Sequence, residues 1–90
     1  MPKAIVDPEE LRRFSSELKR FSGDLKERIS AIHHHFMKLG ETWRDQEHAK
    51  FAAEFEHMVR VLAKFAEASD KQVPLLLRKA ESIRDYLDRR

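Results

Sequence analysis

Apolar side chains recur every three or four residues along the first half of the chain, and this spacing restricts the fold more than any other feature. An α-helix has 3.6 residues per turn, so such a series occupies one narrow stripe on a helix. A stripe of this width packs along a single seam against a neighbouring helix. The series consists of Leu11, Phe14, Leu18, Phe21, Leu25, Ile29, Ile32, Phe36 and Leu39.

The residues that flank this series mark the ends of the helix. Asp7 is a good N-cap, and Pro8 suits the first helical position. Gly40 is expected in the left-handed conformation that commonly follows a helix end. The sequence therefore predicts a helix at about residues 8–39, followed by a turn at about residues 40–45.

A second periodic series predicts a second helix at about residues 46–88. Its apolar residues cover close to half of the helix circumference, which is more than one antiparallel neighbour can hide. Pro74 lies inside the series and predicts a kink, because proline lacks an N–H and crowds the preceding turn. The series consists of Phe51, Phe55, Met58, Val59, Leu62, Phe65, Ala66, Val73, Leu76, Leu77, Ala80, Ile83 and Leu87.

Two long helices joined by a short turn predict an all-α protein, a single antiparallel helical hairpin over residues 1–90. The uncovered apolar strip of the second helix predicts that two hairpins dimerise into a four-helix bundle. The residues expected in the packing and dimer interface are Leu11, Phe14, Leu18, Phe21, Leu25, Ile29, Ile32, Phe36, Phe51, Phe55, Met58, Leu62 and Phe65.

The composition favours association and argues against several classes of protein. A chain of 90 residues without cysteine buries little of its own surface and has no disulfides to compensate. The 18 basic and 16 acidic residues are interspersed, which is typical of a solvated helical surface and not of a nucleic-acid site. No apolar run is long enough to span a membrane, and no Sec-type signal peptide is present. We therefore expect a protein made in the cytoplasm, with no nucleic-acid partner and no stable membrane insertion.

No group of residues predicts catalysis, a metal site or a cofactor. His33, His34 and His35 are consecutive, and successive helical side chains point about 100° apart, so the three cannot converge on one ion. The serines lack a glycine-rich elbow, and the two glycines of the chain cannot build a phosphate-binding loop. We therefore expect no enzymatic activity.

Two features of the sequence each leave two interpretations open. Ser15 and Ser22 are seven residues apart beside the apolar stripe, so they either border solvent or let a neighbouring helix approach closely. Trp43, the only tryptophan, lies in the predicted turn, where so large an apolar ring is seldom exposed. The ring either caps the hairpin's own helices or lies in a groove that a second protomer completes.

The turn carries a resemblance to a known family. The length, the tryptophan between two amphipathic helices, and the aromatic residues Phe51 and Phe55 that follow it resemble the WXG100 family, the small ESAT-6-like proteins of type VII secretion. The chain departs from the Trp-X-Gly signature, since it reads Trp43-Arg44-Asp45. Aspartate is a favoured N-cap, so the turn geometry can survive this change.

The resemblance implies a protein that acts through protein–protein interaction, as a secreted substrate or an export adaptor of a type VII-like system. The implied partners are a second copy, a paralogous WXG100-like chain, and a type VII secretion ATPase. Many exported members carry a C-terminal Tyr-X-X-X-Asp/Glu signal, whereas here Tyr86 is followed four positions later by Arg90. A partner could supply that signal. The alternative is a structural or regulatory helical dimer that stays in the cytosol.

Overall fold

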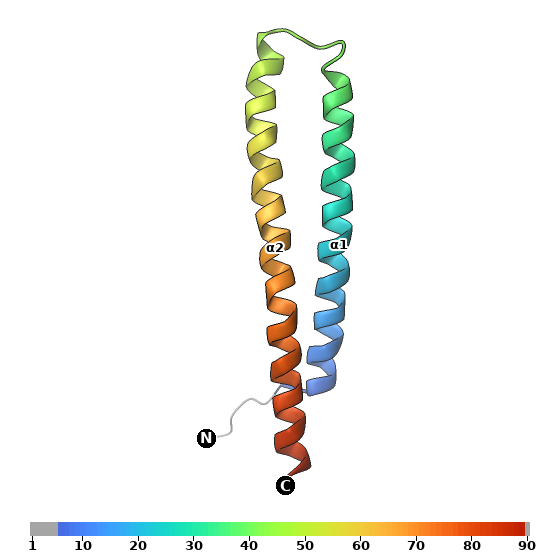
Figure 1. Ribbon diagram of the computed structural model, residues 1–90, viewed down its shortest axis with the longest axis vertical. Helices are drawn as coiled ribbons and strands as arrows, with labels where there is room; N and C mark the ends of the chain where they lie inside the picture. The colour runs from blue at the N-terminus through green and yellow to red at the C-terminus, as the bar shows by residue number, and fades with distance from the viewer. Residues whose placement is uncertain (1–5, 90) are drawn as a thin grey trace.

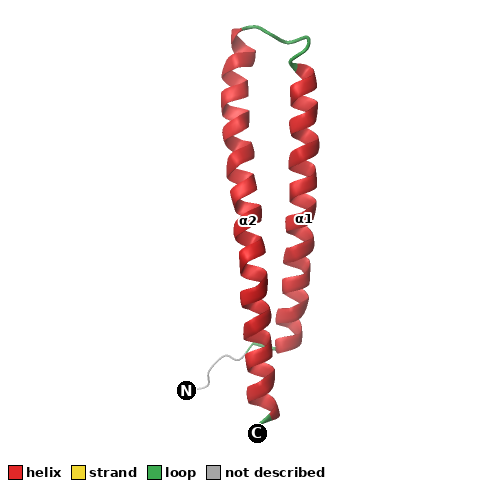
Figure 2. Cartoon of the chain, in the orientation of Figure 1, coloured by secondary structure: helices red, strands yellow, loops and turns green. Residues whose placement is uncertain are grey.

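The protein is an antiparallel hairpin of two long helices (Figure 1). The computed structural model describes residues 6–89, with α1 at Pro8–Leu39 and α2 at Gln46–Asp88. Residues 1–5 and 90, which belong to the expected domain, lie outside the described residues. The hairpin is 68 Å long and 14 Å thick, and no strand occurs within residues 6–89 (Figure 2). The predicted all-α hairpin is confirmed.

A short aspartate side chain begins each helix. Asp7 accepts a hydrogen bond of 2.9 Å from the backbone N–H of Glu9, and Pro8 occupies the first turn, where it has no hydrogen bond to lose. Asp45 accepts a bond of 3.0 Å from the N–H of His48. Asp45 is therefore the N-cap of α2, and the turn ends at this residue.

The left-handed conformation expected for Gly40 is wrong. Gly40 has φ −63° and ψ −13°, which is right-handed, and no residue between 6 and 89 has a positive φ. The chain instead leaves α1 through tighter bonds, from Glu41 N–H to the carbonyl of Lys38 and from Thr42 N–H to that of Leu39, at 3.1 Å each. These bonds satisfy the last carbonyls, so no left-handed cap is needed.

The seam between the helices is built mainly from small residues. Ser15, Ser22, Ala66 and Ala80 are at most 1% exposed, although none of them has a large side chain. Small side chains at a contact let two helix axes approach closely. Of the two interpretations of Ser15 and Ser22, the structure therefore supports close approach.

The sequence predicts that the seam runs along the centre of the large apolar stripe on α1. In the structure the seam instead lies beside this centre. Phe36, at 8% exposure, is the one large aromatic residue of α1 that is buried within the described chain. Phe14 and Phe21 remain 57% and 50% exposed. The close approach of the two backbones at Ser15 and Ser22 leaves no room for these rings between the helices, so they project to one side.

Pro74 lies inside α2, and the helix continues past it to Asp88. Because proline has no N–H, the carbonyl of Asp70 loses its usual partner within the helix. The kink expected near residue 74 stays a prediction. Beyond this point α2 extends past the beginning of α1 (Figure 1). Neither helix, within residues 6–89, is apolar over a long enough stretch to cross a bilayer.

Candidate partner-binding face

One side of the hairpin presents large apolar side chains to solvent. We call this side the apolar face. Its rings contact one another across the seam: Phe21 on α1 and Phe65 on α2 lie edge to face, with ring centroids 6.2 Å apart. Residues seven apart share a side of a helix, which places the other members beside these two. The exposed members of the apolar face are Phe14, Phe21, Ile32, Phe51, Met58, Leu62 and Phe65.

The structure divides the thirteen expected interface residues into two groups. The seven members of the apolar face are between 39% and 57% exposed. The other six line the border of the seam and are buried or half-buried: Leu11, Leu18, Leu25, Ile29, Phe36 and Phe55. One hairpin therefore covers only part of the set, and the helical spacing places the uncovered part on one side of the two helices. Their assignment to a dimer interface remains a prediction.

Near the turn the apolar face is hollowed. A groove of about 240 Å³ lies there, between the ends of the two helices. Phe36 forms its floor, with the Phe55 ring 4.6 Å and the Phe51 ring 5.7 Å away, centroid to centroid. Its walls are almost entirely carbon, so it suits an apolar side chain and not a charged ligand.

Trp43 packs against its own hairpin. Its ring centroid lies 5.0 Å from that of His48, edge to face, and 6.0 Å from that of Phe51. His48 in turn stacks on Phe36 at 5.4 Å. Trp43 is only half-buried by these contacts. The ring thus caps the hairpin's own helices.

The opposite side of the hairpin is charged, and ion pairs join its two helices. Lys26 pairs with Asp70, and Arg84 pairs with Glu9. His33 Nε2 lies 2.9 Å from a carboxylate oxygen of Glu56, and its ring stacks beside Phe55. We call this the charged side. His33 therefore bridges the helices, a role that the consecutive histidines did not predict.

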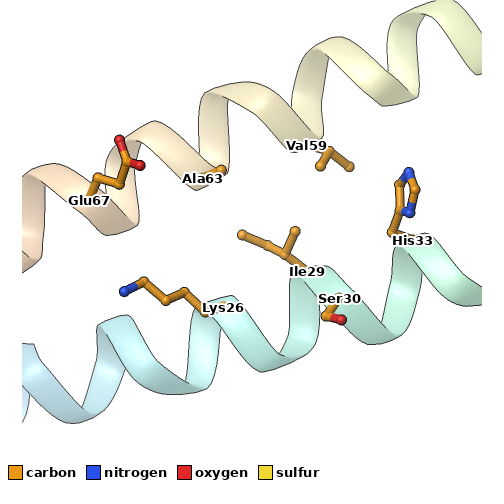
Figure 3. A pocket seen from close by; sticks show the side chains of 7 residues that line it. All are labelled: Lys26, Ile29, Ser30, His33, Val59, Ala63 and Glu67. Carbon is orange, nitrogen blue, oxygen red and sulfur yellow. The ribbon is translucent and has the colours of Figure 1, made fainter.

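A shallow groove lies on the charged side between these pairs, and Figure 3 shows the seven side chains that line it. Its floor is the aliphatic part of the seam, Ile29 from α1 and Val59 and Ala63 from α2. Lys26 and His33 stand at its two ends along α1. The groove thus marks the stretch of seam between two of the ion pairs, where small side chains leave the helices uncovered.

The ion pair at Asp70 includes a buried serine. Ser22 Oγ donates to Asp70 Oδ1 at 2.7 Å and lies 3.0 Å from the carbonyl of Ala66. The Lys26 ammonium and the Ser22 hydroxyl, both bonded to Asp70, hold the pKa of that carboxyl below its ordinary value. Sequence inspection missed this cluster, because its members are 44 and 48 residues apart. The one sequence signal for this cluster was the serine Ser22 beside the apolar stripe of α1.

Within residues 6–89 no three acidic, histidine or cysteine side chains come together as metal ligands would. Across the seam, His33 contacts Phe55 and Glu56, and His48 contacts Phe36. Neither of these histidines contacts another histidine across the seam within the described residues.

The arrangement of two antiparallel helices, a tryptophan at the turn and one apolar face agrees with a match to a known family. The family model described as "Proteins of 100 residues with WXG" matches residues 4–87. The chain belongs to the WXG100 family. The resemblance inferred from the turn is thus confirmed. Asp45, two residues after Trp43, is the N-cap of α2.

Solved structures with the same fold come from EsxB, a secreted protein of Bacillus anthracis str. Sterne. A point mutant of EsxB is 25% identical, with a TM-score of 0.75 over 94% of this chain and 98% of that one. Wild-type EsxB is 24% identical, with a TM-score of 0.76 over 93% and 97%. Among curated protein sequences none matches this chain significantly. The protein is thus a WXG100 helical hairpin with the fold of a secreted relative.

Proposed function

We propose that this WXG100 protein acts by binding other proteins, as a secreted substrate or export adaptor of a type VII-like system, and that it works without catalysis. The observation that carries the proposal is the apolar face. Phe14, Phe21 and Phe65 are at least half exposed on one side of a slender hairpin. Large contiguous apolar patches on a small protein mark interaction sites.

The partner on this face is a second copy or a paralogous WXG100 chain, and the product is a four-helix bundle. Members of the family pair with themselves or with paralogues. A helical neighbour fits the face, since its side chains repeat every three or four residues along both helices. A secretion ATPase would then meet the assembled pair. We propose that it binds the charged outer surfaces, which stay in solvent.

The assembly claim is tested by light scattering at micromolar concentration. The expected mass is that of two chains. Replacing Phe21 and Phe65 by Asp places two charges at the centre of the apolar face, and should give monomers that remain helical by circular dichroism. The matched control replaces Met37 and Tyr86, which are exposed and are not members of the apolar face, by Asp, and should remain dimeric. A wild-type chain that is a stable monomer by itself would remove the homodimer, and one that also stays monomeric when mixed with a paralogous WXG100 chain would sink the proposal.

Export is tested separately, by following the untagged chain in culture supernatant with and without the secretion ATPase. We expect ATPase-dependent release. One observation favours the alternative of a cytosolic structural or regulatory dimer, since Arg90 stands where the export signal has an acid after Tyr86. Co-expression with the neighbouring WXG100 gene product distinguishes the two. Retention in the cytosol even with that partner would leave the dimer and remove the export role.

A further inference from the structure

An arginine and a histidine continue the line of exposed phenylalanines on α1. Phe14, Phe21, Arg28 and His35 are seven residues apart, so they share one side of the helix. Phe21 contacts an aromatic ring of α2, which places this line on the apolar face. All four side chains are exposed, and Arg28 belongs to no ion pair within residues 6–89. The apolar face therefore contains a guanidinium group that its own hairpin does not use.

The order of these four residues is complementary to its own reversal. A second α1 that lies alongside in the opposite direction sets Phe21 of each copy against Arg28 of the other, and Phe14 against His35. A guanidinium over an aromatic ring is attracted by the π electrons of the ring. The line reverses about a point between Phe21 and Arg28, within about one residue of the middle of α1. The two copies of α1 therefore overlap over nearly their full length.

The same alignment also suits α2. Phe21 lies at the level of Phe65, and seven residues forward along α1 correspond to seven residues back along α2, so Arg28 lies at the level of Met58. The reversed second copy then sets its Met58 against Phe65. A thioether sulfur beside an aromatic ring is a favourable contact. One alignment thus gives favourable contacts on both helices.

Phe14 can complete the groove near the turn only from a second copy. In its own chain it lies 21 residues before His35, which lines the groove, and this is about 32 Å along the helix. The ring is 57% exposed and cannot reach its own groove. Reversal of the second copy brings Phe14 to the groove of the first, and two-fold symmetry fills both grooves at once.

A parallel second copy matches the same side chains less well. A two-fold axis along the hairpin sets α1 of one copy against α2 of the other at the same level. Arg28 then faces Met58 instead of a ring, Phe14 faces the amide of Gln72, and the two grooves face each other. In the reversed arrangement the corresponding mismatch is Phe51 against Gln72.

Charges at the border of the apolar face are compatible with reversal. The border on α1, three residues after each member of the line and one heptad before the first, consists of Glu10, Glu17, Asp24, Ala31 and Lys38. Reversal sets Glu10 against Lys38, which is an attractive pair, and Asp24 against Asp24 of the second copy, which is a repulsive one. Arg28 lies one helical turn after Asp24, so its positive charge offsets this repulsion.

We propose that the apolar face binds a second copy of this chain in the reversed orientation, with Arg28 of each copy on the Phe21 ring of the other and Phe14 of each copy in the groove of the other. This rests on the proposed function and names the residues that select the partner. Any apolar helix could cover the face. A reversed second copy also accounts for the order of the side chains on it and for a groove that its own chain leaves open.

The orientation is measured with one spin label per chain, at Glu41→Cys in the turn, because the chain has no cysteine of its own. Reversal sets residue 41 against residue 8, so the two labels should lie about 50 Å apart, which is 33 residues at 1.5 Å each. A parallel dimer would bring both labels to the same end, separated only by the width of the bundle. That result would overturn the reversed pairing and leave the dimer itself.

A double-mutant cycle tests the arginine contact. Arg28→Ala and Phe21→Leu should each raise the dimer Kd about tenfold, since the contact is made twice, and the double variant should raise it less than the product of the two effects. The two residues are about 10 Å apart within one chain, so coupling in the Kd reports a contact between copies. Independent, multiplicative effects would overturn this contact. Arg28→Lys should retain most of the affinity, and the control Arg13→Ala, exposed on the outer edge of α1, should retain all of it.

The groove contact is tested by Phe14→Ala, which should raise the Kd about tenfold or more. Its control is Tyr86→Ala, because this ring is similarly exposed, at 60%, but lies beyond the turn of a reversed second copy. Equal effects of the two variants would overturn the groove contact, and circular dichroism checks that both remain helical. A wild-type chain that pairs only with a paralogue would overturn self-pairing but leave the proposed function. A chain that stays monomeric with either partner would remove both.

Discussion

Ser22 of α1 and Asp70 of α2 are joined by a hydrogen bond of 2.7 Å at the middle of the seam, where Ser22 is fully buried. The same hydroxyl lies 3.0 Å from the carbonyl of Ala66, one helical turn before Asp70. A polar pair in this place fixes the level at which the two helices meet, because a slide of one residue breaks both contacts. The pair also carries the clearest pH dependence of the fold.

Acid should destabilise the wild-type protein more than the variant Asp70→Asn. Lys26 and Ser22 bond to the carboxylate, so the folded-state pKa of Asp70 lies below that of the unfolded chain, which is about 3.9. The stabilisation is therefore complete above about pH 4 and is lost as the pH falls through the folded-state pKa. Thermal melts of both proteins from neutral to strongly acidic pH measure the difference. Parallel curves would contradict it.

Enlarging Ser22 should cost more than enlarging a serine outside the seam. Ser22→Leu forces a large side chain into the closest approach of the two helices and removes the bond to Asp70, for an expected loss of about 1–3 kcal/mol. Ser16→Leu, at an exposed position, is the matched control and should change the free energy of unfolding by less than about 0.5 kcal/mol. Urea unfolding measures both. Equal losses would show that the seam tolerates larger residues.

Removing the ring of Trp43 should loosen the turn. Fully buried tryptophans typically contribute about 3–5 kcal/mol, and a half-buried one contributes less, about 1–2 kcal/mol here. Trp43→Ala should therefore lower the melting temperature by roughly 5–10 °C, whereas Glu41→Ala in the same turn should leave it nearly unchanged. An unaltered melting temperature for Trp43→Ala would mean that the contacts with His48 and Phe51 contribute nothing.

Two substitutions of Asp45 separate its capping role from the family signature. Asp45→Ala removes the bond to the His48 N–H and should cost about 1 kcal/mol. Asp45→Gly restores Trp-X-Gly and should cost only a few tenths of a kcal/mol, since glycine is tolerated at N-caps. Chemical denaturation distinguishes them. Equal stability of the two variants would argue against a cap at this position.

Resemblance to a family could be inferred from the sequence because its signals are local. Trp43 follows a helix-breaking turn, and Phe51 and Phe55 repeat at helical spacing after it. Asp45 acts as an N-cap because its side chain accepts a hydrogen bond from the backbone N–H of His48, only three residues later. The error at Gly40 has a local cause as well. Hydrogen bonds from backbone N–H groups of the turn to the carbonyls of Lys38 and Leu39 take the place of the left-handed cap. Glycine is compatible with both kinds of helix end, so its presence does not distinguish them.

The pairing partners across the seam could not be inferred in the same way. His33 meets Glu56, and Lys26 meets Asp70, although the sequence separates these partners by 23 and 44 residues. Helical periodicity states which residues share a side of one helix, but not how far that helix is rotated against its neighbour. A rotation of a few tens of degrees decides whether a stripe lies in the seam or beside it.

The amino-acid sequence by itself determined that this chain forms two amphipathic helices joined by a tryptophan turn, since helix periodicity, caps and turns depend on residues at most a few positions apart. Only the tertiary structure decided which side of each helix is hidden. The helices approach most closely where serine and alanine allow it, and dispersion contacts grow with that approach. Phe14, Phe21 and Phe65 are thereby displaced from the seam and become the face that another helix can cover.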